Sequence, residues 1–247
     1  MKRLKHPNVV VLHEVINNPK GREFYLVQEY MSAGSVVPEE ERVDPLSITL
    51  AKRYFRDMLC GLEYLHFQGV IHRDIKPGNI LVSEEGRCKI ADFGTAAITP
   101  QDDDTLSDVQ GTPAYWPPEL FDPELKSYHG KAVDIWALGA TLYTIVVGRP
   151  PFLANNQMEL AEEVKTKQPA FPSVVQADPY LRDVLERMIE KDPAKRISLA
   201  DLITHAWVTD EGTVVLQKNR YRYLNLYQSQ QTDPVVFTNG LDQQVRP

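Results

Sequence analysis

The chain has 247 residues, of which 43% are hydrophobic and 25% are charged, a composition ordinary for one or two globular domains. Its formal net charge of −7 argues against bulk binding to nucleic acid or to an anionic membrane, because both need a basic surface. Two cysteines, Cys60 and Cys88, are too few for a disulfide framework or a four-cysteine zinc site, and they favour a reducing compartment. We therefore expect a cytoplasmic protein, with the nucleus as a second compartment.

The sequence predicts no membrane segment. The opening residues, MKRLKHPN, are basic but lack the apolar stretch of a secretory signal. The longest apolar run, residues 132–147, contains Asp134 and is short for a bilayer span. We expect this run to form a buried core helix.

Two strands and a long helix are predicted first along the chain. Residues 9–16 are β-branched and apolar, residues 23–28 (EFYLVQ) form a second such run, and a turn cluster lies between them. After a polar stretch, Ser47 can cap a helix whose apolar residues recur at three- and four-residue spacing. Gly69 stands where a C-terminal glycine belongs.

The rest of the chain is predicted to be mainly helical. Short strands are expected at 70–71, 80–82 and 88–91, and an exposed polar loop over 95–112. Helical patterns then cover four segments: 131–147, 156–166, 179–189 and 198–205. The stretch 209–247 is polar and Gln-rich, and we predict a weakly ordered tail there.

The segment HRDIKPGN, residues 72–79, and the triplet DFG, residues 92–94, carry the chemistry. Phosphoryl transfer needs an oriented acceptor hydroxyl, and Mg²⁺ to neutralise the triphosphate. Asp74 can receive the hydroxyl proton, and Lys76 can reach the transferring phosphate. Asn79 and Asp92 offer the oxygen ligands that Mg²⁺ prefers.

These two strings resemble the catalytic loop and the metal-binding loop of eukaryotic protein kinases. The segment GTPAYWPPE, residues 111–119, resembles the end of an activation segment, although it has Pro-Pro-Glu where the family has Ala-Pro-Glu. Within the kinases, the strings HPNVVVLHEV, GLEYLH, HRDIKPGN, GTPA and HAWVTDEG most resemble the calcium/calmodulin-dependent protein kinase kinase branch.

The resemblance implies an α+β, protein-kinase-like fold, mainly the helical C-lobe with a two-strand remnant of the N-lobe. We expect the N-lobe remnant and hinge at residues 1–35, the C-lobe at 36–208, and the tail at 209–247. The implied activity is transfer of the ATP γ-phosphate to Ser or Thr hydroxyls of proteins, with activation-loop threonines of other kinases as acceptors. ATP and Mg²⁺ are the implied cosubstrate and cofactor.

The resemblance also assigns site residues. Asp74, Lys76 and Asn79 are the expected catalytic residues, and Asn79 and Asp92 would hold Mg²⁺. Glu29 and Met31 would offer hinge backbone groups to adenine. The full set expected to contact the nucleotide is Gln28 at the rear of the pocket, Glu29, Met31, Leu81 beneath adenine, and Asp92.

Supporting contacts follow from the same resemblance. Glu119 and Arg196 resemble a buried ion pair, Asp134 resembles a residue that hydrogen-bonds the catalytic loop, and Thr112 is placed to bond Lys76. A stacked apolar column is expected from three residues, Leu12, His72 and Phe93. Each assignment has an alternative. Glu119 and Arg196 could be separate surface charges, and Asp134 could be a simple acid at a helix N-terminus. The three residues of the apolar column could be ordinary core packing.

No GxGxxG and no VAIK-like string occurs in these 247 residues, so the family's Gly-rich loop, strand Lys and helix Glu have no counterpart here. Three explanations are open: a sequence that starts at an internal methionine, a genuine short form without catalysis, and a form active with another nucleotide grip. We expect the chain by itself to bind Mg-ATP weakly and to turn over little. The rival hypothesis is a non-catalytic interaction module.

Two regulatory questions are also open. Arg73 precedes Asp74, as in kinases that grip a loop phosphate, with Thr99, Thr105 and Ser107 as candidate acceptors; alternatively, the acidic run 102–104 supplies the charge. In the tail, basic residues alternate with aromatic ones over 218–226. Calmodulin binding by that segment is weighed against a solvated tail.

Overall fold

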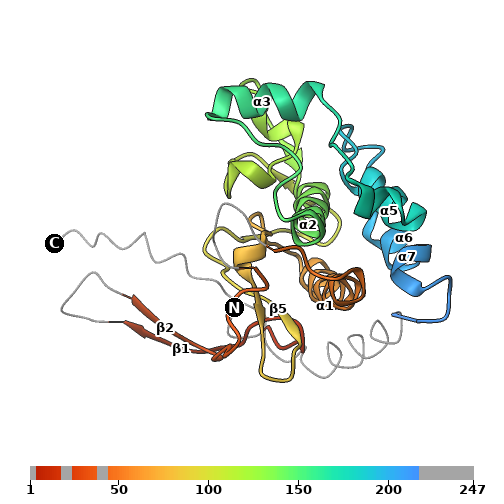
Figure 1. Cartoon of the computed structure of the whole chain (residues 1–247). Helices are drawn as coiled ribbons and strands as arrows, with labels where there is room; N and C mark the ends of the chain where they lie inside the picture. Colours follow the sequence, from red (N-terminus) through yellow and green to blue (C-terminus); the bar gives the residue numbers. More distant parts are fainter. Residues whose placement is uncertain (1–3, 18–23, 38–43, 217–247) are drawn as a thin grey trace. The chain divides into compact units, whose positions relative to one another are not determined.

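The structure, a computed structural model, describes residues 4–17, 24–37 and 44–216. The strands of this described part are short and pair into four antiparallel two-stranded sheets, β1–β2, β3–β6, β4–β5 and β7–β8. Figure 1 labels the β1–β2 pair and strand β5. The strands are β1 Leu12–Asn17, β2 Phe24–Gln28, β3 Val70–Ile71, β4 Ile80–Val82, β5 Cys88–Ile90, β6 Ala97–Ile98, β7 Thr105–Leu106 and β8 Tyr128–His129.

Helices supply most of the core. They are α1 Ile48–Phe67, α2 Gly130–Val147, α3 Gln157–Thr166, α4 Ser173–Gln176, α5 Pro179–Met188, α6 Leu199–Ile203 and α7 Ala206–Thr209. Short 3₁₀ turns cover Pro77–Asn79, Pro113–Tyr115 and Pro118–Phe121. The mixture of strand and helix, with few strands among the described residues 4–17 and 24–37, agrees with the predicted α+β class.

Helix α1 begins and ends where the sequence predicts. The Ser47 hydroxyl accepts a hydrogen bond from the Leu50 N–H at 3.4 Å, which caps the first turn. Gly69 follows the helix with a φ of +70°, and a Cβ there would lie 2.4 Å from the Thr99 carbonyl oxygen. Only glycine fits this close approach, so the chain can turn directly into β3.

Helix α2 lies at the centre of the domain and packs against α1 and α5. Among the described residues it is the one helix whose length and composition would suffice to cross a membrane, with a mean hydropathy of 1.3. The protein itself buries 83% of that span, as expected for a core helix. Its apolar character is therefore explained by neighbours on all sides.

The β1–β2 hairpin is tied to the rest of the domain at its base. The Val10 N–H donates to the Ile90 carbonyl at 2.9 Å, and Val9 forms a bridge with the same residue. Beyond this base, the apolar side chains of β2 remain open to solvent, with Phe24 67% and Leu26 54% exposed.

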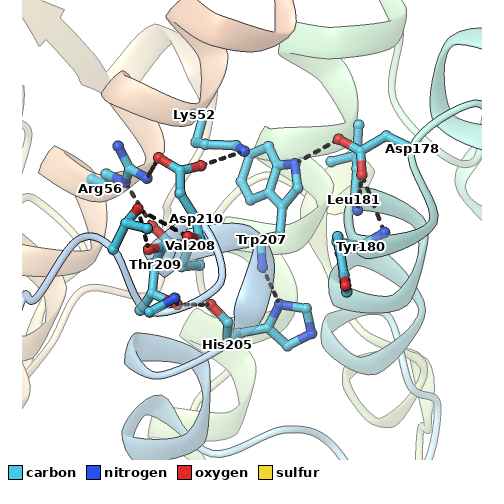
Figure 2. A network of polar contacts seen from close by, with 12 residues as sticks. Lys52, Arg56, Asp178, Tyr180, Leu181, His205, Trp207, Val208, Thr209 and Asp210 are labelled. Atoms are coloured by element: carbon cyan, nitrogen blue, oxygen red, sulfur yellow. Dashed lines mark hydrogen bonds and ion pairs between the residues drawn. The ribbon is translucent and has the colours of Figure 1, made fainter.

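The end of the described domain is fastened to α1 by charge and ring contacts (Figure 2). Asp210 binds Lys52 at 2.8 Å and Arg56 at 2.5 Å, while the Trp207 indole N–H donates to Asp178 at 3.1 Å. The Lys52 ammonium also lies 5.1 Å from the Trp207 ring centroid. Thr209 and Asp210, which the sequence assigns to the tail, thus belong to the packed end of the domain. The remaining tail, 217–247, lies outside the described residues.

The loop predicted over 95–112 differs from expectation because it contains two short strands. In β6, Ile98 pairs with Val70, and in β7, Thr105 pairs with His129. A strand of two residues is too short to show an alternating pattern in the sequence. Its position is set by pairing with a distant strand, so it could not be predicted locally. The first strand also starts at Leu12 rather than Val9, because Val9 is used for the bridge to Ile90.

Candidate active site

Asp134, on the first turns of α2, holds the backbone that precedes Asp74. Its carboxylate is fully buried and accepts hydrogen bonds from the His72 N–H at 2.9 Å and the Arg73 N–H at 2.8 Å. The His66 ring nitrogen Nε2 lies 2.9 Å from the same carboxylate. These contacts confirm the predicted link to the loop, and they support the left-handed backbone of Arg73, whose φ is +68°.

Asp74, Lys76 and Asn79 come together as the sequence predicts. The Asn79 amide donates to the Asp74 carbonyl at 2.8 Å and to its carboxylate at 3.0 Å. The Lys76 ammonium lies 3.2 Å from the same carboxylate oxygen, Oδ2. A cation and an amide therefore fix the orientation of the Asp74 side chain.

The activation segment reaches this group through Thr112. Its N–H donates to Asp74 Oδ1 at 2.8 Å, and its hydroxyl accepts from Lys76 at 2.9 Å. The preceding Gly111 has a φ of +100°, and a Cβ there would lie 2.2 Å from the Arg73 carbonyl oxygen. The segment thus passes directly against the catalytic loop, where a side chain at 111 would block it.

His72 links the catalytic loop to the DFG triplet. Its Nδ1 accepts the Asp74 N–H at 3.3 Å, so the proton is on Nε2, which donates to the Ala91 carbonyl at 2.9 Å. Burial lowers the pKa of His72 and favours this neutral form. The Phe93 ring meets the imidazole edge-on, with centroids 5.1 Å apart. Leu12, the third member of the expected column, is buried.

Asn79 and Asp92 stand at neighbouring ends of the β4–β5 hairpin. Ile80 pairs with Ile90, and the Ala91 N–H donates to the Asn79 carbonyl at 2.8 Å, so Asp92 follows directly. The Asp92 backbone is left-handed, with a φ of +57°, and its Oδ1 accepts the Gly94 N–H at 3.1 Å. The hairpin register therefore places both predicted metal ligands at one end of the sheet.

The donor atoms of these two residues fit Mg²⁺. Within the described residues, hydrogen bonds use Asn79 Nδ2 and Asp92 Oδ1, which leaves Asn79 Oδ1 and Asp92 Oδ2 for a cation. Two oxygen ligands suit an ion that keeps water and nucleotide phosphates as its other ligands. The described chain has no group of three or more His, Cys, Asp or Glu that could hold a metal alone.

The expected adenine contacts form an apolar cluster. Met31, Val10 and Ala91 pack together, and Leu81 packs against them. The Glu29 N–H donates to the Val11 carbonyl, and the Met31 carbonyl accepts the Gly34 N–H. Among the described residues, the Glu29 carbonyl and the Met31 N–H have no backbone partner, and such an acceptor and donor could meet the edge of a base.

Two observations qualify the hinge prediction. The Glu29 side chain forms an ion pair with Lys89 of β5 and accepts from the Val11 N–H at 3.3 Å, contacts that no local sequence signal indicates. Gln28 is exposed at the end of β2, opposite Leu12. The structure records no contact from its side chain to the other described nucleotide residues.

The predicted ion pair between Glu119 and Arg196 is present and bidentate. The two nitrogen–oxygen distances are 2.8 and 3.1 Å, and the Arg196 side chain is only 1% exposed. Arg196 also stacks on Trp136, 5.1 Å from the ring centroid. The pair fastens the end of the activation segment to the helical core.

Comparison with known proteins defines the class. Residues 1–208 match the protein kinase domain family, and the chain therefore belongs to that family. It is 42% identical over 223 residues to a calcium/calmodulin-dependent protein kinase kinase of Caenorhabditis elegans, covering 89% of this chain and 41% of the relative. It is 42% identical over 218 residues to the serine/threonine-protein kinase ssp1 of Schizosaccharomyces pombe, covering 85% and 33%.

A probable serine/threonine-protein kinase of Dictyostelium discoideum is 39% identical over 237 residues, covering 95% of this chain and 33% of the relative. Two of these relatives are serine/threonine kinases by name, and the third is named a kinase kinase, the branch that the sequence motifs resemble. The chain spans about a third to two fifths of the length of these three proteins.

Proposed function

We propose that this chain carries the phosphotransfer machinery of a serine/threonine protein kinase, which moves the γ-phosphate of Mg-ATP to a protein hydroxyl. The observation that carries the proposal is the convergence of Lys76, Asn79 and Thr112 on the Asp74 carboxylate. These groups come from two segments of the chain, the catalytic loop and the activation segment. Together they fix the orientation of one acidic side chain, which is what a residue that orients a reacting hydroxyl requires.

The chemistry follows from this geometry. Asp74 Oδ2 already meets Asn79 and Lys76, whereas Oδ1 accepts only the Thr112 N–H among the described residues. Oδ1 thus has a further lone pair, to which a substrate hydroxyl can donate and so be aimed at the phosphate. Such a proton acceptor typically contributes about 10²–10⁴-fold to rate. Lys76 brings a positive charge within reach of the transferring group, and Mg²⁺ held by Asn79 and Asp92 supplies neutralisation of the triphosphate charge.

We also propose that the acceptors are activation-loop threonines of other kinases. The nematode relative is named a kinase kinase, which supports this substrate class. The contact of Lys76 with Thr112 supports a Ser/Thr rather than a Tyr acceptor by resemblance. Gly78 and Thr144 stand where arginine-directed kinases have acids, which disfavours substrates with arginines just upstream.

The test is a single-turnover assay with γ-labelled ATP, Mg²⁺ and an activation-loop peptide. The chain lacks the Gly-rich loop and strand Lys strings, so we expect slow transfer, roughly 10²–10³ below an ordinary kinase rate. Asp74→Asn should abolish it, while Asp102→Asn, on an exposed loop position, should match wild type. Transfer that survives Asp74→Asn contradicts the proposal.

The second candidate is a non-catalytic interaction module. Its support is the sequence itself, which holds no GxGxxG and no VAIK-like string. A chain that shows neither Mg²⁺-dependent nucleotide binding by calorimetry nor Asp74-dependent transfer would fit this module rather than an enzyme.

Calmodulin binding and cytoplasmic location remain proposals. The basic and aromatic residues in question, within 218–226, lie outside the described residues, and support comes from the name of the nematode relative. Calcium-dependent binding of calmodulin to the full chain, absent from a chain ending at Leu216, would establish the tail as the target. Cys60 and Cys88 are both free thiols, which suits a reducing compartment.

A further inference from the structure

The Trp116 side chain closes a short loop at the end of the activation segment. Its indole N–H donates to the Gln110 carbonyl at 3.0 Å, so the loop 110–116 begins and ends at one hydrogen bond. The loop contains Gly111 and Thr112, which pass against the catalytic loop. The Gln110 carbonyl belongs to the same peptide unit as the Gly111 N–H, so this bond holds the peptide unit through which the chain enters its left-handed turn.

Backbone hydrogen bonds connect the other end of the loop to Thr112. The Tyr115 N–H donates to the Thr112 carbonyl at 2.9 Å, and the Trp116 N–H donates to the Pro113 carbonyl at 3.1 Å. These bonds form the 3₁₀ turn Pro113–Tyr115. The positions of Thr112 and Trp116 are therefore linked through a turn of defined geometry.

The Trp116 ring is anchored on its other side by the helical region. It meets the Phe121 ring edge-on, with centroids 5.4 Å apart. It also packs against a cluster of buried residues, which are Leu120, Tyr128 and Val133. An indole that is held by packing offers its N–H in a fixed direction, with little further loss of side-chain entropy.

Pro117, which stands where the kinase pattern has alanine, restricts the backbone of Trp116. A residue before proline avoids the helical region, because the proline ring would clash with it there. Trp116 has a φ of −80° and a ψ of 139°, which lie in the extended region that remains allowed. The departure from the family pattern thus favours the backbone conformation from which Trp116 reaches Gln110.

We propose that Trp116 is a positioning residue, whose indole N–H closes the loop 110–116 and so sets where Thr112 lies. Thr112 in turn donates its N–H to Asp74, and to that extent the inference rests on the proposed phosphotransfer. Pro117 keeps Trp116 in the backbone conformation that the closed loop needs. Among the described residues, Trp116 makes no hydrogen bond to Asp74, so it acts on that carboxylate through Thr112.

The first arm of the test follows the indole proton and needs no activity. The chain has three tryptophans, so the 247-residue protein labelled with ¹⁵N-tryptophan gives three indole N–H signals in an NMR spectrum, and Trp116→Phe identifies the signal of Trp116. We expect this proton to exchange with solvent at least roughly tenfold more slowly than that of a free indole. A Trp116 indole proton that exchanges at the free rate overturns the proposal.

The same signal tests the part played by the proline. Pro117→Ala should speed exchange of the Trp116 indole proton about threefold, because the backbone before residue 117 gains conformational freedom. Pro123→Ala, at an exposed position further along the chain, is the matched control and should leave the exchange unchanged. Equal exchange in the two variants contradicts the role assigned to Pro117.

A pair of variants separates the hydrogen bond from general packing. Trp116→Phe keeps an aromatic ring but removes the N–H donor, whereas Phe121→Leu removes the edge-on ring partner and leaves the donor in place. Hydrogen–deuterium exchange over 110–116 should rise about tenfold in Trp116→Phe and less than about twofold in Phe121→Leu. Equal rises in both variants would show that packing, and not the hydrogen bond, closes the loop.

The second arm measures phosphotransfer. Trp116→Phe should lower the single-turnover rate at saturating peptide about tenfold and leave the Kd for Mg-ATP unchanged, because a loosened Thr112 no longer orients Asp74. If wild type transfers no phosphate, the proposed function fails, and the exchange arm still decides whether Trp116 closes the loop. An unchanged rate in Trp116→Phe, together with faster exchange over 110–116, contradicts positioning.

Discussion

The region around the catalytic loop and the β1–β2 hairpin differ in how their side chains are held. Around the loop, Asp134 and Arg196 are buried and each makes several charged or polar contacts. In the hairpin, apolar side chains such as Phe24 and Leu26 are more than half exposed. The residues proposed to carry out the chemistry thus lie in the part of the chain that is held most firmly.

The difference separates two tasks of a phosphotransferase. Orienting a hydroxyl demands fixed groups, because small displacements cost much rate, and Asp74 is fixed by contacts from within the helical region. Nucleotide binding is proposed to depend on the hinge, where Glu29 and Met31 join the hairpin to that region. Substitutions around the catalytic loop should therefore affect stability or the transfer rate, whereas substitutions at the hinge should affect nucleotide affinity, and the effects should also differ in size.

The largest effect is expected at the ion pair of the activation segment. Glu119→Ala leaves the Arg196 charge buried without its carboxylate, which should lower the free energy of unfolding by about 3–5 kcal/mol. Urea denaturation measures this loss. Glu162→Gln, at an exposed position on α3, should stay within about 0.5 kcal/mol of wild type. Equal stabilities for the two variants would show that Arg196 does not depend on its partner.

A pH effect is expected from His6, which precedes the hairpin and stacks on Tyr64 of α1 with ring centroids 5.0 Å apart. Burial, with a smaller contribution from the Lys89 charge, lowers the pKa of His6 to about 4. Between its ordinary pKa of about 6.5 and this value, the unfolded chain binds the proton more readily, so folding loses stability as pH falls.

The expected loss from His6 is about 3 kcal/mol, complete near pH 4 and absent above about pH 6.5. Urea denaturation of wild type and His6→Gln at pH 7, 5.5 and 4 isolates it, since the other titrating groups are shared. The stability difference between the two proteins should shrink as the pH falls. A difference that stays constant would mean that His6 does not remain neutral in the folded protein.

A smaller effect is expected where the hinge meets β5. Lys89→Gln removes the ion pair with Glu29 and should weaken Mg-ATP binding roughly tenfold, because the hinge backbone loses its anchor. Isothermal titration gives the Kd. Lys126→Gln, at an exposed site in the turn before β8, is the matched control. The single-turnover rate at saturating nucleotide should be unaffected, and a lower rate would place Lys89 in the chemistry instead.

The smallest effect is expected in the hairpin itself. Leu26→Ala should change the free energy of unfolding by less than about 0.5 kcal/mol, because the side chain is 54% exposed. The same substitution at Leu62, which is fully buried in α1, should cost about 2–5 kcal/mol. Similar costs at both positions would mean that the hairpin is covered in solution.

Local signals in the sequence were sufficient to predict α1. Ser47, the apolar spacing and Gly69 all act within a few residues of the helix, and the structure agrees at both ends. The grouping of Asp74, Lys76 and Asn79 could be predicted equally well, because all three lie within six consecutive residues. The fold class and the family could also be predicted, from the sequence motifs and from the order of the predicted strands and helices.

Contacts between distant segments could not be predicted in the same way. Asp108 meets Arg73 across 35 residues, whereas the alternative left open from the sequence, that acidic residues supply the loop's charge, named the run 102–104. Asp104 caps α2, a role that depends on the pairing of β7 with β8. Neither acid carries a local pattern that distinguishes it from its neighbours, so only the folded chain reveals which one binds the arginine.

The most direct test of a shared phosphotransfer site is a crystal structure with Mn²⁺ and a non-hydrolysable ATP analogue at high concentration. We expect an anomalous peak within roughly 2.1 Å of Asn79 Oδ1 and an Asp92 oxygen, with the Asp74 carboxylate facing the γ-phosphate. A cation bound away from Asn79 and Asp92, or a triphosphate that does not face Asp74, would contradict a kinase mechanism built on these residues.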